Sequence, residues 1–163
     1  MSKPLLAIDV DGVICPYGWD DDVGPPPGGE WRLMNGLPYF VLISAGERLR
    51  RLEPHYELVW ATGWEDRAND FLPNLLGIPE LDVVWFKGTK TFGEAHWKLD
   101  GLTAYAKDRP LAWIDDSFDE SCHAWAEARA EPTLLVEADN AVGITEAHIE
   151  AMLRWAEEGF TPR

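Results

Sequence analysis

The chain alternates between short, mainly apolar runs and longer segments in which apolar residues recur every three or four positions. Short apolar runs without polar alternation are typical of parallel strands that are buried on both faces of a sheet. On this basis we expect strands at residues 4–9, 57–61, 81–86, 111–114 and 133–137.

The segments between these runs carry the period of amphipathic helices. Ser44 and Thr145 suit the N-cap positions of the first and last helix, and Gly77 suits the C-terminal cap of the second. Helices are expected at residues 44–53, 65–76, 97–107 and 118–130, and from residue 145 onward. Strands that alternate with helices imply right-handed crossovers and a parallel sheet covered on both faces. The predicted fold class is α/β, with three layers in the order α/β/α.

A loop and a hairpin interrupt this alternation after the first strand. Residues 17–29 are acidic and then rich in proline and glycine, which predicts an irregular loop. Asn35-Gly36 separates apolar runs at residues 30–34 and 37–43, and this dipeptide is a strong signal for a β-hairpin. The length of 163 residues fits one domain, so we expect a single domain over residues 1–163, with the loop and hairpin at about 16–43.

Polar residues gather where the predicted strands end. In parallel α/β sheets, ligands bind outside the carboxyl ends of the strands. Singly, an Asp-Gly pair is usually a turn, and an Asp-Asp pair before a helix is often an N-cap. Together and in this order, they predict one site. Its members are Asp9, Asp11 and Gly12, then Thr62, Gly63 and Trp64, then Lys98 at the start of a helix, then Asp115, Asp116 and Ser117.

The acids of this set suit the hydrolysis of a phosphate monoester. Asp9 supplies a carboxylate nucleophile that would form an aspartyl-phosphate, and Asp11 can protonate the leaving group and then accept a proton from water. Asp9 and Asp116, with the backbone carbonyl of Asp11, are hard oxygen ligands for Mg²⁺. Asp115 is either an alternative ligand or a residue that supports the ligands.

The remaining members of the set suit a phosphate group. Lys98 places a positive charge near the nucleophile, and the Thr62 hydroxyl can donate to a phosphate oxygen. Gly12 allows a tight turn whose N–H groups could also donate. With Gly63 and Trp64, Gly12 is a candidate substrate-binding residue.

Composition limits the choice of partners and compartment. The net charge of −15, from 14 basic and 29 acidic residues, repels phosphate backbones and argues against non-specific nucleic-acid binding. A nucleic-acid end remains open as a substrate. Cys15 and Cys122 lack metal or disulfide spacing and suggest reduced thiols in the cytoplasm. The first residues lack a basic flank followed by a long apolar run, and no apolar stretch approaches membrane-spanning length, so we expect a soluble, cytoplasmic protein.

The four strand-end segments resemble the motifs of the haloacid dehalogenase (HAD) superfamily, over nearly the whole chain. The matching residues are Asp9-x-Asp11-Gly12-Val13, Thr62-Gly63, Lys98 and Asp115-Asp116. The resemblance implies a Rossmann-like sheet with a flap hairpin and a Mg²⁺-dependent phosphatase activity. The gaps between the motifs are too small for a full cap domain, which indicates a capless member. Residues 59–64 and 113–116 also resemble HAD domains of actinobacterial proteins and bacterial RNA-repair proteins.

The chain contains nine tryptophans and four histidines. Trp19 and Trp64 could stack on a base or sugar, or simply pack. We expect five tryptophans to pack in the core, three within apolar strands (Trp60, Trp85 and Trp113) and two on helix faces (Trp125 and Trp155). The histidines show no metal-ligand spacing and are expected to be non-catalytic; they are His55, His96, His123 and His148.

Four functions therefore stay open from the sequence. The first is a phosphatase acting on a nucleotide, nucleic-acid end, sugar phosphate or phosphoprotein. The second is a non-catalytic phosphate-binding module, which would be expected to lose Asp9 or Asp11, whereas both are present. The third is a hydrolytic dehalogenase, which would require neither Asp11 nor a metal. The fourth is a phosphotransferase or mutase, which would need a device to exclude water, and no cap is evident.

Overall fold

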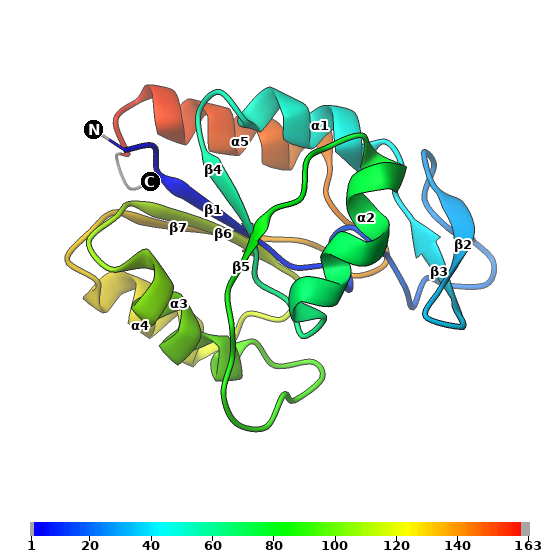
Figure 1. Ribbon diagram of the computed structural model, residues 1–163, viewed down its shortest axis with the longest axis horizontal. Helices are drawn as coiled ribbons and strands as arrows, with labels where there is room; N and C mark the ends of the chain where they lie inside the picture. Colours follow the sequence, from blue (N-terminus) through cyan, green and yellow to red (C-terminus); the bar gives the residue numbers. More distant parts are fainter. Residues whose placement is uncertain (1, 161–163) are drawn as a thin grey trace.

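The computed structural model describes residues 2–160, and a parallel five-stranded sheet lies at its centre (Figure 1). The strand order is β5-β4-β1-β6-β7, so β1 is central and its four residues are fully buried. The strands are β1 (Leu5–Ile8), β4 (Glu57–Trp60), β5 (Asp82–Val83), β6 (Leu111–Asp115) and β7 (Thr133–Glu137). The predicted α/β class is confirmed.

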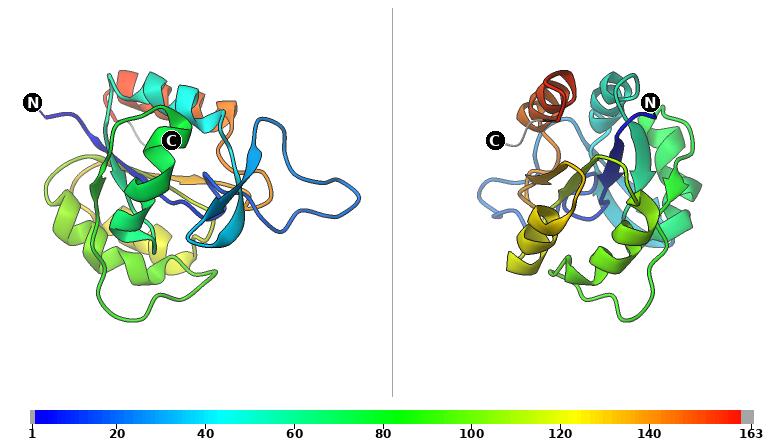
Figure 2. Two further views of the ribbon diagram at one scale, coloured as in Figure 1. Left: turned by 45° about the vertical axis from the view of Figure 1, so that its right-hand side comes forward. Right: turned by 90° about the vertical axis from the view of Figure 1, so that its left-hand side faces the viewer.

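Helices cover both faces of the sheet (Figure 2). Successive residues of a strand point to opposite faces, so Leu6 and Ile8 of β1 belong to one core cluster, while Leu5 and Ala7 belong to the other. The first cluster packs on α1 (Ala45–Leu52), α2 (Ala68–Leu76) and α5 (Glu146–Glu157). The second packs on α3 (Leu99–Ala106) and α4 (Glu120–Ala128).

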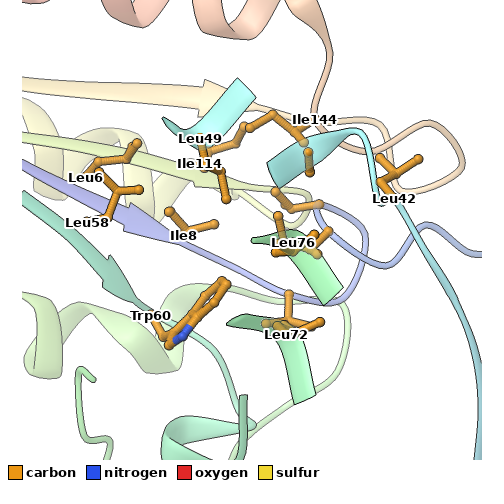
Figure 3. Packing of buried hydrophobic residues seen from close by; sticks show 14 of the residues in the cluster. Leu6, Ile8, Leu42, Leu49, Leu58, Trp60, Leu72, Leu76, Ile114 and Ile144 are labelled. Carbon is orange, nitrogen blue, oxygen red and sulfur yellow. The ribbon is translucent and has the colours of Figure 1, made fainter. Parts of the chain in front are cut away.

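The larger cluster joins α2 to the strands (Figure 3). The Trp60 side chain is fully buried among leucines, and its indole N–H donates to Asn69 Oδ1 at 2.9 Å. The amide nitrogen of Asn69 then donates to the Leu81 carbonyl at 2.8 Å. A buried indole needs such a partner, because an unpaired donor costs about 1–3 kcal/mol.

The predicted hairpin is confirmed. Strands β2 (Glu30–Met34) and β3 (Leu37–Val41) pair antiparallel beyond the carboxyl end of β1 (Figure 1). Asn35 and Gly36 both have positive φ, 53° and 79°, as a two-residue turn of type I′ requires. The hairpin therefore stands beside the edge of the sheet where the polar residues gather.

Three expectations, for one strand, one tryptophan and one helix cap, are wrong. The strand expected at residues 81–86 is limited to Asp82–Val83, because β5 is an edge strand that pairs only with Val59 and Trp60. Trp85 consequently leaves the core and is 60% exposed. Ser44 has helical dihedrals and makes no side-chain cap; its hydroxyl instead accepts from Arg48 at 3.4 Å.

Other element ends follow the predicted signals. Gly77 ends α2 in the left-handed conformation, with φ of 65°. Thr145 caps α5 by accepting from the His148 N–H, while His148 Nδ1 accepts from the Thr145 N–H at 3.0 Å. Short 3₁₀ turns, η1 (Glu65–Arg67) and η2 (His96–Lys98), precede α2 and α3.

The other tryptophans expected in the core are buried or partly buried. Trp60 and Trp113 are fully buried and Trp155 is nearly so, whereas Trp125 is half-buried with its ring edge-on to Trp113. Cys15 and Cys122 are buried free thiols. Within residues 2–160, every helix is too short or too polar to cross a bilayer.

Replacing Gly46 by Ala should destabilise the protein. A Cβ at Gly46 of α1 would lie 1.8 Å from the Leu76 carbonyl oxygen of α2, a backbone atom that cannot turn away. We expect the free energy of unfolding to fall by about 1–3 kcal/mol, the usual cost of overpacking. The better helix propensity of Ala opposes this loss by only about 1 kcal/mol. Urea unfolding measures the difference.

Gly63→Ala is the matched control, because the nearest atoms to its Cβ would be at an ordinary 3.7 Å. It should unfold close to the wild-type midpoint. A Gly46→Ala variant as stable as the wild type would contradict the close packing of α1 on α2.

Candidate active site

Strand register brings the separate motifs together at one edge of the sheet. Ile8 of β1 is paired with Ile114 of β6, and the Asp9 N–H donates to the Ile114 carbonyl at 3.1 Å. Asp9 therefore lies beside Asp115 at the carboxyl ends of adjacent strands. On the other side of β1, the Ala61 N–H donates to the Ile8 carbonyl at 2.8 Å, which brings in the residue after it, Thr62.

Lys98 lies between two of the carboxylates. Its Nζ is 3.0 Å from Asp9 Oδ1 and 2.6 Å from Asp115 Oδ2, and the residue is 3% exposed. Burial alone lowers the pKa of Lys98, but the charges of Asp115 and Asp9 outweigh burial and raise this pKa above its usual range. The two carboxylates thus favour the charged ammonium form of Lys98.

The carboxylates outnumber this ammonium group. Oxygens of Asp9, Asp115 and Asp116 lie within 4.8 Å of one another. Burial raises the pKa of Asp9 well above its usual range, and the charge of Asp115 adds to the effect, while Lys98 opposes it. Burial and then Asp115 also raise the pKa of Asp116. The three carboxylates therefore carry more negative charge than the Lys98 ammonium group can balance.

Asp115 and Asp116 have different surroundings. Asp115 is 1% exposed, and its oxygens accept from Lys98 and, at 3.0 Å, from the Ser117 N–H. Asp116 is only partly buried; it accepts from the Tyr17 hydroxyl at 3.0 Å and the Ser117 hydroxyl at 3.1 Å. The structure thus uses Asp115 to hold Lys98 and keeps Asp116 at the surface of the cleft.

Gly12 lies against Asp116. Its φ is 81°, and a Cβ on it would lie 2.2 Å from Asp116 Oδ2. The position needs glycine both for its conformation and for the close approach of the carboxylate. The Gly12 N–H donates to the Cys15 carbonyl at 2.9 Å. Our expectation that this N–H is free for a phosphate is therefore wrong.

Asp11 faces the same cleft and is held by Trp64. The Trp64 indole N–H donates to Asp11 Oδ2 at 3.2 Å, a contact between residues 53 positions apart. Burial raises the pKa of Asp11, against the opposing effects of the Trp64 hydrogen bond and the Lys98 charge. A carboxyl group with a raised pKa is suited to donating a proton near neutral pH.

Trp64 is 9% exposed, and its ring packs edge-on against Tyr39 and Phe71. It presents its polar edge to the site. Its backbone N–H donates to the Thr62 hydroxyl oxygen at 3.2 Å, which ties Trp64 to the end of β4. Gly63 lies beside them in the wall of the cleft.

The residues predicted for the site line a cleft of about 320 Å³, apart from Gly12 and Thr62, which lie behind its wall. The cleft also includes residues that the sequence analysis missed. Tyr17 comes from the loop after β1, Tyr39 from the hairpin, and Lys90 and Phe92 from the segment before η2. These residues have no local signal, because only the folded chain brings their segments over the strand ends.

Other candidates lie elsewhere or have structural roles. Trp19 packs edge-on against Trp31 and Phe40 next to the hairpin. His96 Nδ1 is 2.7 Å from the Ser121 hydroxyl on the surface, and His148 belongs to the α5 cap.

Comparisons with known proteins show the fold alone. No family model and no curated protein matches the chain. Among solved structures, the chain is similar to a hypothetical protein of Xanthomonas campestris, XCC2798. The TM-score is 0.51 at 14% identity, over 96% of this chain and 85% of the other. The arrangement of layers is thus shared with a protein of very different sequence.

Replacing Lys98 by Met should strongly destabilise the protein. The change keeps an apolar stem but leaves Asp9 and Asp115 facing each other without the ammonium group. Removing one partner of a buried ion pair costs about 3–5 kcal/mol. The free energy of unfolding should be measured in EDTA, so that no added cation replaces the lysine charge.

Asp115→Asn should cost less, because Lys98 still pairs with Asp9. The double variant, Lys98→Met with Asp115→Asn, should lose less than the two single losses together, since the residues are in direct contact. Additive losses would show that the two groups do not stabilise each other.

Proposed function

We propose that this protein is a Mg²⁺-dependent phosphatase that hydrolyses a phosphate monoester through an aspartyl-phosphate on Asp9. The observation that carries the proposal is the convergence of Asp9, Lys98 and Asp116 in one cleft, with Asp11 opposite and hydrogen-bonded to Trp64. The four motifs also support a place among capless members of the HAD superfamily.

The residues present fit a magnesium ion. Mg²⁺ prefers carboxylate and carbonyl oxygens. Carboxylate oxygens of Asp9 and Asp116 lie within 4.8 Å of each other, close enough to share one ion. Asp115 is the poorer ligand, because it is 1% exposed and its Oδ2 pairs with the Lys98 ammonium group at 2.6 Å, whereas Asp116 is only partly buried and its oxygens accept from neutral hydroxyl groups. Asp9, Asp116 and the Asp11 carbonyl would hold the ion, which would offset the repulsion between these acids and a phosphate.

In the first step, an Asp9 carboxylate oxygen attacks phosphorus, and the bond from phosphorus to the leaving oxygen breaks. The leaving oxygen takes its proton from Asp11 and departs as the alcohol. Lys98 faces the phosphate oxygens, where charge develops in the transition state. The Thr62 hydroxyl lies behind the wall of the cleft, where it accepts from the Trp64 backbone N–H and supports that wall.

In the second step, a water molecule attacks phosphorus, and the bond from phosphorus to Asp9 breaks. Asp11 accepts a proton from that water and is ready for another cycle. Over the two steps, one phosphate monoester and one water molecule give one alcohol and one inorganic phosphate. The hydrogen bond from Trp64 orients Asp11 for both transfers.

Asp9→Asn should abolish hydrolysis, because an amide does not attack phosphorus usefully. The test is turnover of an aryl phosphate together with acid-quench trapping of labelled phosphoryl-enzyme. Wild-type protein should lose activity in EDTA, regain it with Mg²⁺ and yield the labelled adduct. Asp9→Asn should do none of these.

Asp108→Asn, a change at an exposed aspartate outside the cleft, is the control and should behave as wild type. If the wild-type protein binds phosphate but never turns over an ester, it is a non-catalytic phosphate-binding module. Activity unchanged by EDTA or by Asp9→Asn would reject the mechanism.

Asp11→Asn should slow hydrolysis in a way that depends on the leaving group. Loss of general acid catalysis typically costs about 10²–10⁴-fold. The loss should be large for an alkyl phosphate such as glycerol 3-phosphate and smaller for p-nitrophenyl phosphate, whose phenolate departs without a proton. Equal losses for both substrates would remove Asp11 from the role of acid.

A further inference from the structure

A second cavity, of about 430 Å³, opens beside the active-site cleft. The two share four lining residues, Asp11, Tyr17, Tyr39 and Phe92. The second cavity extends from there between the loop after β1 and the hairpin; its other lining residues are Cys15, Pro16, Gly18, Trp19, Trp31 and Pro38.

The two spaces differ in chemistry. The active-site cleft holds several carboxylates and the cations Arg67, Lys90 and Lys98. Among the described residues that line the second cavity, Asp11 alone carries a charge, and five side chains are aromatic. This cavity therefore suits an uncharged, flat group rather than a second phosphate or a polyanion.

Some of these rings are exposed to solvent. Trp31 is 58% exposed and Phe92 is 76% exposed, although each contacts another ring. The Trp31 ring packs edge-on against Phe40, which is 6% exposed and fixes the hairpin to the core. The cavity thus combines an anchored frame with aromatic surface that a ligand could cover, as binding sites for small molecules commonly do.

The position of Asp11 indicates what the second cavity binds, provided that Asp11 is the acid of the proposed function. The group that protonates the leaving oxygen must lie on the side of the leaving group. Asp11 is at the junction of the two spaces, so an alcohol that leaves beside Asp11 extends into the aromatic cavity.

We propose that the second cavity binds the leaving group, and that this group is a single nucleoside, so the substrate is a nucleoside monophosphate. A base is flat and uncharged, and aromatic side chains stack on every base with little regard to sequence. A polynucleotide end fits less well, because its further phosphates would meet no cation in this cavity.

The test compares 5′-AMP with ribose 5-phosphate, which share the same primary alcohol and differ in the base. Wild-type kcat/KM should favour 5′-AMP by about 10-fold or more, in line with base stacking on an aromatic ring. Trp31→Leu should lower kcat/KM for 5′-AMP more than kcat/KM for ribose 5-phosphate, so that the preference falls to near 1.

Trp85→Leu is the matched control. Trp85 is 60% exposed, as Trp31 is 58% exposed, but it lines neither space. The preference for 5′-AMP should persist in this variant. Trp19→Leu is a second test of the cavity, and its fold should be checked by urea unfolding because Trp19 also packs on Phe40.

Calorimetry of adenosine binding separates this inference from the proposed function. If adenosine binds in a Trp31-dependent manner but no ester is hydrolysed, the nucleoside site stands and the phosphatase fails. If aryl phosphates are hydrolysed, but 5′-AMP has no advantage over ribose 5-phosphate and adenosine does not bind, the nucleoside site fails. Faster turnover of phosphocholine or of a 5′-phosphorylated oligonucleotide than of 5′-AMP would also overturn it.

Discussion

The rest of the site depends on the ion pairs that the buried Lys98 ammonium group forms with Asp9 and Asp115. A charge so deep in the protein is tolerated only when partners of opposite charge surround it. The register of β1 against β6 supplies both partners, because it sets the residues after Ile8 and Ile114 side by side. The segment before α3 is tied to the same strand end, where the Ala95 N–H donates to the Ser117 carbonyl at 3.0 Å.

Once Lys98 is placed, similar carboxylates take different roles because their surroundings differ. Asp115 is committed to the core, whereas Asp116 remains at the cleft and is steadied by hydroxyl groups. Asp11 lies away from this cluster and receives the indole N–H of Trp64. In the proposed mechanism, environment rather than residue type thus separates ligand, support and acid.

The hairpin shows how a small two-stranded sheet can shape a site beside the central parallel sheet. The similarity to a protein of 14% identity concerns the layers of the fold, and a fold of this kind hosts many activities. Tyr39 and Trp31 come from the hairpin and meet Tyr17 and Phe92 from two other segments. Aromatic packing on Phe40 holds Trp31 in place, so specificity would be built on the loops and the hairpin while the strand ends hold the acids.

The sequence by itself determined the alternation of strands and helices, the Asn35-Gly36 turn and the members of the acidic cluster, because these depend on local patterns and on the common edge where parallel strands end. Only the tertiary structure decided that β5 is short and Trp85 exposed, since an edge strand lasts only as long as its neighbour pairs with it. The tertiary structure also decided that Asp115 pairs with Lys98, while Asp116 accepts a hydrogen bond from Tyr17. The Tyr17 hydroxyl donates a hydrogen bond to Asp116, 99 positions away in the sequence. A local sequence pattern cannot predict such a contact, because only folding brings the two segments together.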